Sequence, residues 1–252
     1  MIEIFILSLI QGITEFLPIS SSSHLILASE YLDFENQSLS IDVSLHIGSF
    51  IGVVLYFNKD IINFFKNKIF FIKILVCSLP VMIVGYILIE TGYINKIRNI
   101  KTIAWTTIIF GLLLYLSDKF KLEKNIKNNF DYKAIFFIGF LQILSLIPGV
   151  SRSGIAISAA RILKFNRVDS AKISFMLSIP ILGAVTIFGL NNLIINDDIN
   201  FSILNILSIF FSFLFSYITV KFFLQYMKKF DLKIFVFYRI ILGSILLLFA
   251  YL

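Results

Sequence analysis

The sequence predicts an all-α polytopic membrane protein, with six transmembrane helices and two re-entrant helical hairpins arranged as an inverted-topology repeat. Three observations support this prediction. Hydrophobic residues make up 58% of the 252 residues and charged residues only 15%. The mean hydropathy is +0.93. Eight apolar stretches follow one another, and two of them are interrupted by a proline and several polar side chains. This composition leaves no room for a separate soluble domain.

The eight apolar stretches cover residues 2–29, 41–57, 69–90, 103–117, 133–160, 173–190, 201–225 and 234–252. Most of them approach the roughly 20 residues that a helix needs to cross a bilayer. The first and the fifth contain the polar interruptions. We interpret these two as re-entrant hairpins, because a broken helix persists at membrane depth only where protein or water satisfies its backbone.

The order of segments is a hairpin followed by three spans, and this order occurs twice. The halves cover about 1–117 and 133–252, joined by a polar linker at about 118–132, within one integral membrane domain, 1–252. Because each half contains an odd number of spans, the second half enters the membrane in the opposite orientation. Such inverted repeats typically form their site at the midplane, where broken helices meet.

Basic residues predict how the chain is oriented in the membrane. Fifteen lysines and arginines lie in the loops 58–68, 118–133, 161–172 and 226–233. Only three lie in the N-terminus and the loops 30–40, 91–102 and 191–200. The positive-inside rule makes the first group of loops cytoplasmic, so we expect both termini outside the cytoplasm. The same loops account for the net charge of +7, which favours contact with anionic lipids over nucleic-acid binding.

The first polar interruption combines a carboxylate with a run of serines. Gln11 and Glu15 are four positions apart, so they share one face of a helix. Pro18 ends that helix, and the run Ser20–Ser23 lies where a second half-helix begins. Hydroxyl groups and free backbone N–H groups at a helix start bind anions. His24 follows Ser20 by one helical turn, which places its imidazole over the same site.

The second interruption begins with Pro148 and Gly149, which break the helix. Ser151, Arg152 and Ser153 then open the next half-helix. The planar guanidinium of Arg152 suits phosphate oxygens, which it binds through two parallel hydrogen bonds. We therefore interpret the two interruptions as the facing halves of one phosphate site at membrane depth.

Structural roles are the alternatives for several polar residues. A lone serine in a membrane helix usually allows close packing or hydrogen-bonds to a neighbouring helix, whereas four serines after a proline favour a site. Arg152 has an alternative role as a counter-ion to Glu15. We interpret four further polar residues as structural or interfacial, the last two by snorkelling at the start of the final span. They are Asp42, His46, Tyr238 and Arg239.

At these residues the chain resembles the bacterial undecaprenyl-pyrophosphate phosphatases of the bacitracin-resistance type. That family carries an (E/Q)GxTEFLPISSxxHL stretch and a PGxSRSGxT stretch, which match residues 11–25 and 148–156. Residues 42–48, 175–180 and 238–243 also resemble family stretches, so the likeness covers nearly the whole chain. Ala156 stands where the family usually has threonine, and Ser23 where it usually has glycine or alanine.

The resemblance implies removal of one phosphate from a C55 polyprenyl pyrophosphate outside the cytoplasm. This reaction regenerates the carrier lipid of peptidoglycan synthesis and confers bacitracin resistance. By position, the catalytic residues implied are Glu15, Ser21, His24 and Arg152. The substrate-binding residues implied are Gln11, Ser20, Ser22, Gly149, Ser151 and Ser153. A divalent cation, Mg²⁺ or Ca²⁺, is also expected, with Glu15 as its ligand. Gln11 removes a possible second carboxylate from that cation site.

Two mechanisms and a second function remain open at this point. Ser21 attacks phosphorus after His24 or Glu15 takes its proton, or a water positioned by Glu15 and His24 attacks directly. The alternative function is transport of a polyprenyl phosphate through the same anion site, since inverted repeats are typical of transporters. A transporter needs no general base, so the presence of Glu15 and His24 favours an enzyme. The oligomeric state stays open, with a homodimer as one option.

Overall fold

Six long apolar helices dominate the computed structural model, which describes residues 1–252 except 32–33, 35–37, 67 and 196–201. By length and composition each of the six could cross a membrane. They are α3 (Leu39–Tyr56), α5 (Lys68–Glu90), α7 (Ile100–Asp118), α11 (Arg167–Ile195), α12 (Ile203–Tyr226) and α13 (Lys233–Tyr251). Each coincides with one of the six predicted spans. The prediction of an all-helical chain with six apolar helices is therefore confirmed for the described residues.

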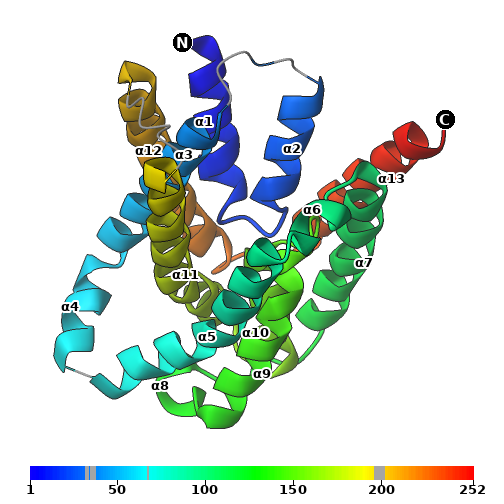
Figure 1. The fold of residues 1–252 in the computed structure, drawn as a ribbon. Helices are drawn as coiled ribbons and strands as arrows, with labels where there is room; N and C mark the ends of the chain where they lie inside the picture. Colours follow the sequence, from blue (N-terminus) through cyan, green and yellow to red (C-terminus); the bar gives the residue numbers. More distant parts are fainter. Residues whose placement is uncertain (32–33, 35–37, 67, 196–201) are drawn as a thin grey trace.

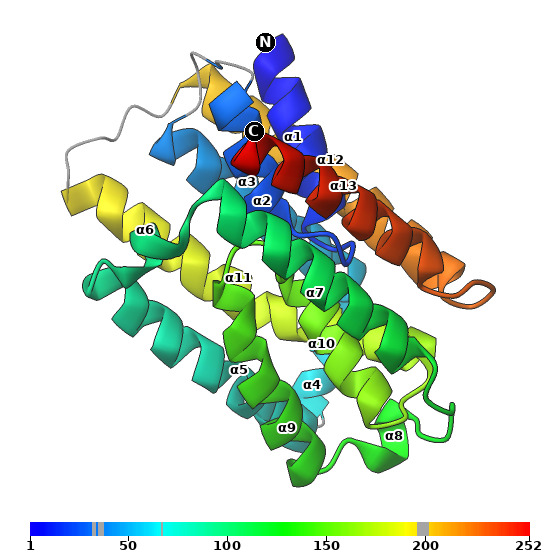
Figure 2. The ribbon, with the colours of Figure 1, turned by 90° about the vertical axis from the view of Figure 1, so that its right-hand side faces the viewer.

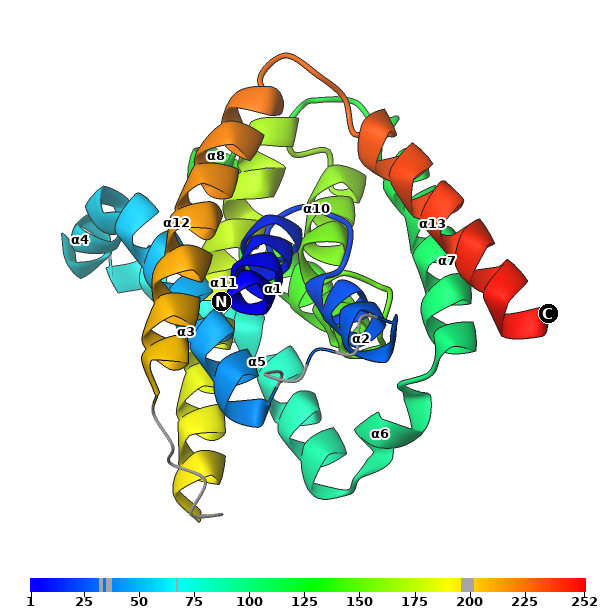
Figure 3. The same cartoon turned by 90° about the horizontal axis from the view of Figure 1, so that it is seen from above.

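The two interrupted stretches each fold as a helix, a break and a second helix. The first unit consists of α1 (Ile2–Thr14) and α2 (Ser21–Tyr31). The second unit consists of α9 (Tyr132–Gln142), a 3₁₀ turn η1 (Ile143–Leu146) and α10 (Arg152–Ile162). Figure 1 shows α1 and α2 side by side. Seen from above, α1, α2 and α10 lie in the middle of the molecule with the long helices around them (Figure 3).

Three short helices connect the longer ones: α4 (Asn58–Lys66), α6 (Tyr93–Ile97) and α8 (Ile126–Asn129). Figure 1 shows α4 and α8 at the end of the molecule opposite to the two termini. Figure 2 shows α7 beside α13 and α5 beside α9. The loops that carry most basic residues and the chain termini thus lie at different ends.

Polar side chains define where several helices begin. The Ser38 hydroxyl accepts a hydrogen bond from the backbone N–H of Ile41 at the start of α3. Asn99 caps α7 in the same way, and Asp131 caps α9. Such caps satisfy N–H groups that have no partner within the helix and typically contribute about 1 kcal/mol each.

Small residues bring α1 and α3 close to α12. A Cβ atom on Gly12 would lie 2.5 Å from Cβ of Phe215, so α1 packs against α12 with almost no space. Between α3 and α12, the hydroxyl of Ser49 lies 3.1 Å from that of Ser212 and 3.0 Å from that of Ser216. Small side chains and interhelical hydrogen bonds are the usual means of helix association in an apolar environment.

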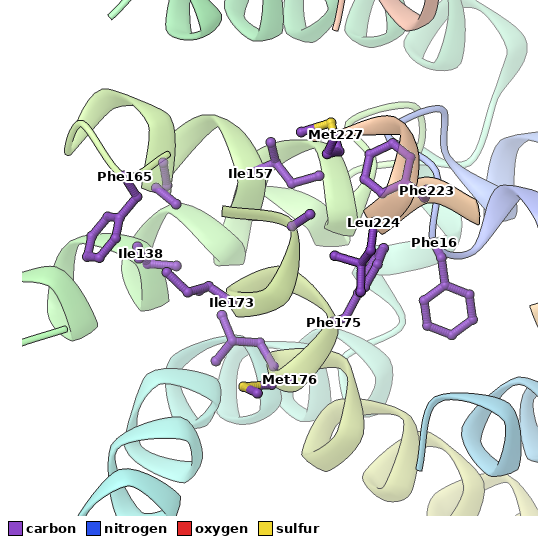
Figure 4. Packing of buried hydrophobic residues seen from close by; sticks show 14 of the residues in the cluster. Phe16, Ile138, Ile157, Phe165, Ile173, Phe175, Met176, Phe223, Leu224 and Met227 are labelled. Atoms are coloured by element: carbon purple, nitrogen blue, oxygen red, sulfur yellow. The ribbon is translucent and has the colours of Figure 1, made fainter. Parts of the chain in front are cut away.

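A cluster of aromatic side chains fixes the first break against the long helices (Figure 4). Phe16 is fully buried, and its ring meets that of Phe175 on α11 edge to face, with centroids 5.5 Å apart. Phe175 in turn contacts Phe223 on α12, at 5.7 Å. The backbone immediately after α1 is therefore anchored to two long helices, which holds the neighbouring Glu15 in place.

An ion-pair cluster joins several helices at the end that carries the basic loops. Asp118, the last residue of α7, accepts hydrogen bonds from Nε and Nη2 of Arg167 at 2.8 and 2.9 Å. It also accepts from the backbone N–H of Leu232 at 3.2 Å and from Nε of Arg161 at 3.3 Å. The cluster ties α7, α10, α11 and the start of α13 together.

Candidate active site

Glu15 lies at the centre of the site, just after the last residue of α1, and is only 6% exposed. Its Oε1 accepts a hydrogen bond from Nη2 of Arg152 at 2.6 Å, and the two side chains form an ion pair. Its Oε2 accepts from the hydroxyl of Ser21 at 2.5 Å. The structure thus brings together three of the predicted catalytic residues, and they come from both helix–break–helix units.

Gln11 holds the other side of the Glu15 carboxylate. Its Nε2 donates to Oε2 of Glu15 at 3.1 Å and lies 3.1 Å from Nδ1 of His46 on α3. An amide nitrogen only donates, so in this amide orientation Nδ1 of His46 accepts and the proton of the neutral ring lies on Nε2. His46 therefore adjoins the site and is not merely interfacial. The sequence offered one signal for this role of His46: the residue lies in the stretch 42–48, which resembles the family.

The two breaks share a backbone feature immediately before their second helices. Ser20 has φ = 76° and Ser151 has φ = 71°, both in the left-handed region. Non-glycine residues there typically cost about 1–3 kcal/mol and persist where the surroundings hold them. Ser151 caps α10 by accepting from the backbone N–H of Gly154 at 3.1 Å. Its hydroxyl also lies 3.1 Å from that of Ser153.

The four-serine run divides into different environments. Ser21 contacts Glu15 and is half-buried, whereas Ser22 is exposed, with its hydroxyl 3.4 Å from that of Ser20. Ser23 is fully buried, and its hydroxyl lies 3.0 Å from that of Ser20. Only Ser21 therefore reaches the carboxylate, while Ser20 and Ser23 hold the turn that opens α2.

The second unit packs directly onto the first. The hydroxyl of Ser153 donates to the carbonyl oxygen of Leu17 at 2.7 Å. Gly149 has φ = +91°, and a Cβ atom there would lie 2.1 Å from the hydroxyl oxygen of Thr106. Glycine is thus required by both the backbone conformation and the close approach of α7. Gly149 shapes the break, and its contact with substrate stays a prediction.

Arg239 is fully buried, so its interpretation as a snorkelling residue is wrong. Its Nη1 donates to the carbonyl oxygens of Pro18 and Val150, both at 3.1 Å. Its Nη2 donates to Gly149 at 2.8 Å, and its Nε to Thr107 at 3.1 Å. The two breaks leave carbonyl groups that no helix satisfies, and a guanidinium supplies the missing donors. Arg239 therefore joins both breaks from the last helix.

Tyr238 also belongs to the site, contrary to the interfacial interpretation. Nδ1 of His24 lies 2.6 Å from the carbonyl oxygen of Ser20, and a carbonyl only accepts, so Nδ1 carries the proton. Nε2 of the neutral ring then accepts from the Tyr238 hydroxyl at 2.5 Å. The two rings stack with centroids 5.7 Å apart. In the described part of the chain both nitrogens of His24 are thus engaged by residues other than Ser21.

Two buried polar atoms at the site have no hydrogen-bond partner among the described residues. They are Nη1 of Arg152 and Oε1 of Gln11. Leaving such groups unpaired typically costs about 1–3 kcal/mol, and more for a charged group. One donor and one acceptor therefore remain available to a ligand beside the Glu15 carboxylate.

The chain matches a known protein family over most of its length. A family model described as "Bacitracin resistance protein BacA" matches residues 4–245. The chain belongs to the BacA family. The resemblance inferred from the two motifs is thereby confirmed, and the matched region contains both helix–break–helix units.

Curated relatives of this BacA family chain match it over almost its whole length. A protein of Pelagibacter ubique (strain HTCC1062) is 49% identical over 99% of this chain and 98% of its own. A relative from Alteromonas mediterranea is 38% identical, again over 99% and 98%. One from Jannaschia sp. (strain CCS1) is 36% identical over 98% of both chains. Each of the three is named undecaprenyl-diphosphatase.

The divalent cation expected for this BacA family chain finds hard oxygen donors at the site. Oε1 of Gln11 is buried without a partner in the described residues, and Nε2 of the same amide contacts Glu15. Those residues contain no group of three His, Cys, Asp or Glu side chains that could hold a metal. Gln11 and Glu15 would therefore share a cation with the phosphate oxygens of a substrate, as is common for Mg²⁺.

Binding of such a cation would require a rearrangement at Glu15. Both carboxylate oxygens are already engaged, one by Arg152 and one by Ser21 and Gln11. A ligand phosphate that draws Arg152 away would free Oε1 for the metal. When bound, such a cation neutralises the negative charge that develops on a phosphoryl group.

Proposed function

We propose that this chain hydrolyses undecaprenyl diphosphate to undecaprenyl phosphate and inorganic phosphate. The reaction returns the lipid carrier to peptidoglycan synthesis and accounts for the bacitracin resistance of the family name. The observation that carries the proposal is the contact of Glu15 with both Arg152 and Ser21, at 2.6 and 2.5 Å. A carboxylate, a hydroxyl and a guanidinium thus meet around one position, which supports the proposal in a chain whose curated relatives are named undecaprenyl-diphosphatases.

Arg152 and the start of α10 form the phosphate-binding part of the site. Nη1 of Arg152 is buried and has no partner among the described residues, so it is available to a phosphate oxygen. Arg152 is also the first residue of α10, an 11-residue helix whose N-terminal N–H groups favour an anion. The terminal phosphate of the substrate would lie against this helix start, held by charge-assisted hydrogen bonds.

Substrate binding and activation of the base are coupled through Arg152. A phosphate that binds the guanidinium competes with Glu15 for the same group. Glu15 freed from its counter-ion is a stronger base toward the Ser21 hydroxyl, which already donates to it. The structure supports Glu15 over His24 for this role, because Ser20 and Tyr238 engage the two ring nitrogens of His24.

In the covalent mechanism, Glu15 removes the proton of Ser21 and Oγ forms a bond to the terminal phosphorus. The bond from that phosphorus to the bridging oxygen breaks, and undecaprenyl phosphate leaves with the electron pair. Water then hydrolyses the phosphoserine and releases phosphate.

In the alternative mechanism, water activated by Glu15 attacks phosphorus directly and Ser21 only binds phosphate. In both, Arg152 stabilises the charge on the transferred phosphoryl group.

We further propose that the two helix–break–helix units are re-entrant hairpins related by an inverted repeat. Two features support this. Ser20 and Ser151 both have a positive φ immediately before the second helix of their unit, and Arg239 binds carbonyl groups of both breaks. The concentration of basic residues in the opposite loops supports an opening of the site on the extracytoplasmic side. Residues 196–200 of the predicted external loop 191–200 lie outside the described residues.

The direct test is phosphate release from undecaprenyl diphosphate by the purified protein in detergent, with and without a chelator. Arg152→Lys should lower kcat/KM by about a hundredfold or more, because a point charge cannot replace the bidentate fork. Arg98→Lys, in an exposed position, is the matched control and should behave as wild type. An inactive wild-type protein, or near-normal turnover by Arg152→Lys, would contradict the proposal.

A further inference from the structure

An apolar groove of about 410 Å³ opens beside the catalytic histidine, between α1, α2 and α13. Its walls include Ile10, Leu27, Ala28 and Ile245, and His24 lies at one of its edges. The volume falls within the range of about 300–1,000 Å³ that is typical of ligand-binding clefts. Apart from His24, every residue that lines the groove is apolar.

The groove continues the contact between His24 and Tyr238 along the same two helix faces. On α2, Leu27 and Ala28 follow His24 by three and four positions, so all three share one face. On α13, Ile245 follows Tyr238 by seven positions, or two turns. His24 therefore belongs both to the stacked pair and to the wall of the groove. Figure 1 shows α2 and α13 running apart toward the end of the molecule that carries the termini.

We propose that this groove holds the first isoprene units of the lipid substrate while its diphosphate occupies the site at Glu15 and Arg152. The proposal rests on the function proposed above and adds the position of the chain. A prenyl diphosphate is one molecule with a charged end and an apolar chain, so a chain bound next to the phosphate site needs an apolar path that starts there. The apolar lining of this groove meets the first condition. His24 meets the second, because it lines the groove and lies one helical turn after Ser21, which contacts Glu15.

A second apolar groove provides the comparison. It has a volume of about 340 Å³ and is lined by residues of α1 and α12, with Ile13, Ile218 and Phe222 among them. None of its lining residues belongs to the predicted catalytic set. A chain in the second groove would therefore start from no catalytic side chain, which favours the first groove.

We expect the groove to orient the substrate for reaction rather than to increase its affinity for the protein. Lipid tails are as apolar as leucine side chains, so moving a prenyl chain from the bilayer into the groove gains little hydrophobic free energy. Fixing the first isoprene units aligns the diphosphate with Ser21 or a water, and alignment alone can change a rate strongly. Blocking the groove should therefore affect substrates with a chain and spare those whose chain is too short to enter.

Ile245→Trp fills the proposed groove, and Ile218→Trp fills the second groove as its matched control. The wild-type side chains are similarly exposed, 44% and 41%, so both helices should tolerate the change. Leu27→Phe, on the facing wall, is a second groove variant in case the first fails to fold. The assay compares phosphate release from diphosphates with three and eleven isoprene units against the one-unit diphosphate, whose chain is too short to reach Ile245, two helical turns beyond Tyr238.

We expect Ile245→Trp and Leu27→Phe to lower kcat/KM for the long chains by about tenfold, and for the shortest substrate by less than about threefold. Ile218→Trp should leave every substrate near the wild-type value. Equal losses for all chain lengths, or no loss in the folded groove variants, would overturn the proposal. So would a chain-selective loss in Ile218→Trp, which would place the chain in the second groove. A wild-type protein inactive on every diphosphate would instead overturn the proposed function itself.

Discussion

The hydroxyl group of Tyr238 lies 2.5 Å from Nε2 of His24, across 214 positions of the sequence. Because Nδ1 of the same ring is held by the Ser20 carbonyl, the tyrosine completes the fixation of the imidazole in one tautomer and one orientation. The last helix thus orients a residue of the first helix–break–helix unit. If the His24 imidazole accepts or delivers a proton during phosphate release, its rate of transfer depends on this fixed tautomer and orientation.

Tyr238→Phe removes this hydrogen bond and keeps the stacked ring. A neutral hydrogen bond contributes roughly 0.5–1.5 kcal/mol, so kcat should fall about two- to tenfold if His24 takes part in the reaction. The melting temperature should change little, because the ring remains packed. Steady-state kinetics in detergent measures the effect, with Tyr86→Phe, an exposed tyrosine on α5, as control. An unchanged kcat would show that His24 acts without this partner.

Arg239 should matter for the stability of the protein and Arg152 for its activity, and variants of the two residues should show this difference. Arg239→Ala leaves three carbonyl groups of the two breaks without their donor, so we expect a loss of about 3 kcal/mol or more in stability and a clearly lower melting temperature. Arg152→Lys should keep a melting temperature near that of the wild type while losing activity. Thermal unfolding of both variants in the same detergent makes the comparison. A stable Arg239→Ala protein would mean that the breaks hold together by packing alone.

Local signals in the sequence predicted a large part of the fold. Apolar length predicted the six long helices, and Pro18 and Pro148 predicted the two breaks, because both features act over one or two helical turns. Glu15, the serine run and Arg152 were predicted as site residues for the same reason, because charged or clustered polar side chains inside an apolar stretch need a local explanation. Ser21 was singled out from its run by the resemblance to the family. The meeting of these three residues depended on an additional inference, that the two units face each other.

Residues that act through long-range contacts were missed. His46, Tyr238 and Arg239 reach the site from α3 and α13. They lie in stretches that resemble the family, residues 42–48 and 238–243, but no cluster of polar side chains distinguishes them from interfacial residues. Arg239 offered one physical clue, since it lies six positions after Lys233, the first residue of α13. That spacing corresponds to about 9 Å along a helix, which is deep for a snorkelling side chain. Its buried surroundings follow only from the packing of two distant breaks around it.

His46 should act as a positioning residue, through the hydrogen bond that it accepts from Gln11. His46→Asn retains an acceptor near the position of Nδ1, whereas His46→Ala removes it and frees Gln11 to turn away from Glu15. We expect the asparagine variant to keep most of the activity and the alanine variant to lose about tenfold in kcat/KM. Equal losses in the two variants would contradict this role, since packing alone would then explain the residue.

The predicted orientation can be checked with single cysteines in a Cys77→Ala background. Ile195 ends α11 and is 70% exposed, and we expect a cysteine there to react with an impermeant reagent in intact cells. Asn128, in the basic loop between α7 and α9, should react only after the cells are opened. The expectation follows from the fifteen basic residues on one side against three on the other. The reverse labelling pattern would contradict the predicted orientation, and with it the proposed opening of the site outside the cytoplasm.

Ser21 distinguishes the two mechanisms, because its hydroxyl donates to Oε2 of Glu15 at 2.5 Å while that of its neighbour Ser22 is exposed. If Ser21 is the nucleophile, Ser21→Ala should abolish turnover, Ser22→Ala should be mild, and a phosphoserine should form and then hydrolyse. His24→Ala should then accumulate that intermediate if the imidazole assists its hydrolysis.

Direct attack by water gives a different pattern. Ser21→Ala would then lose only hydrogen bonds to phosphate, each worth roughly 1.5–3 kcal/mol, or about ten- to a hundredfold in rate. Rapid-quench labelling with a substrate that carries a labelled terminal phosphate, run beside the Ser21→Ala rate, separates the two. Labelled protein in the wild type and no residual turnover in the variant would establish the covalent route. A residual rate of a few per cent without labelled protein would leave Ser21 as a phosphate-binding residue, and Glu15 as the base that activates water.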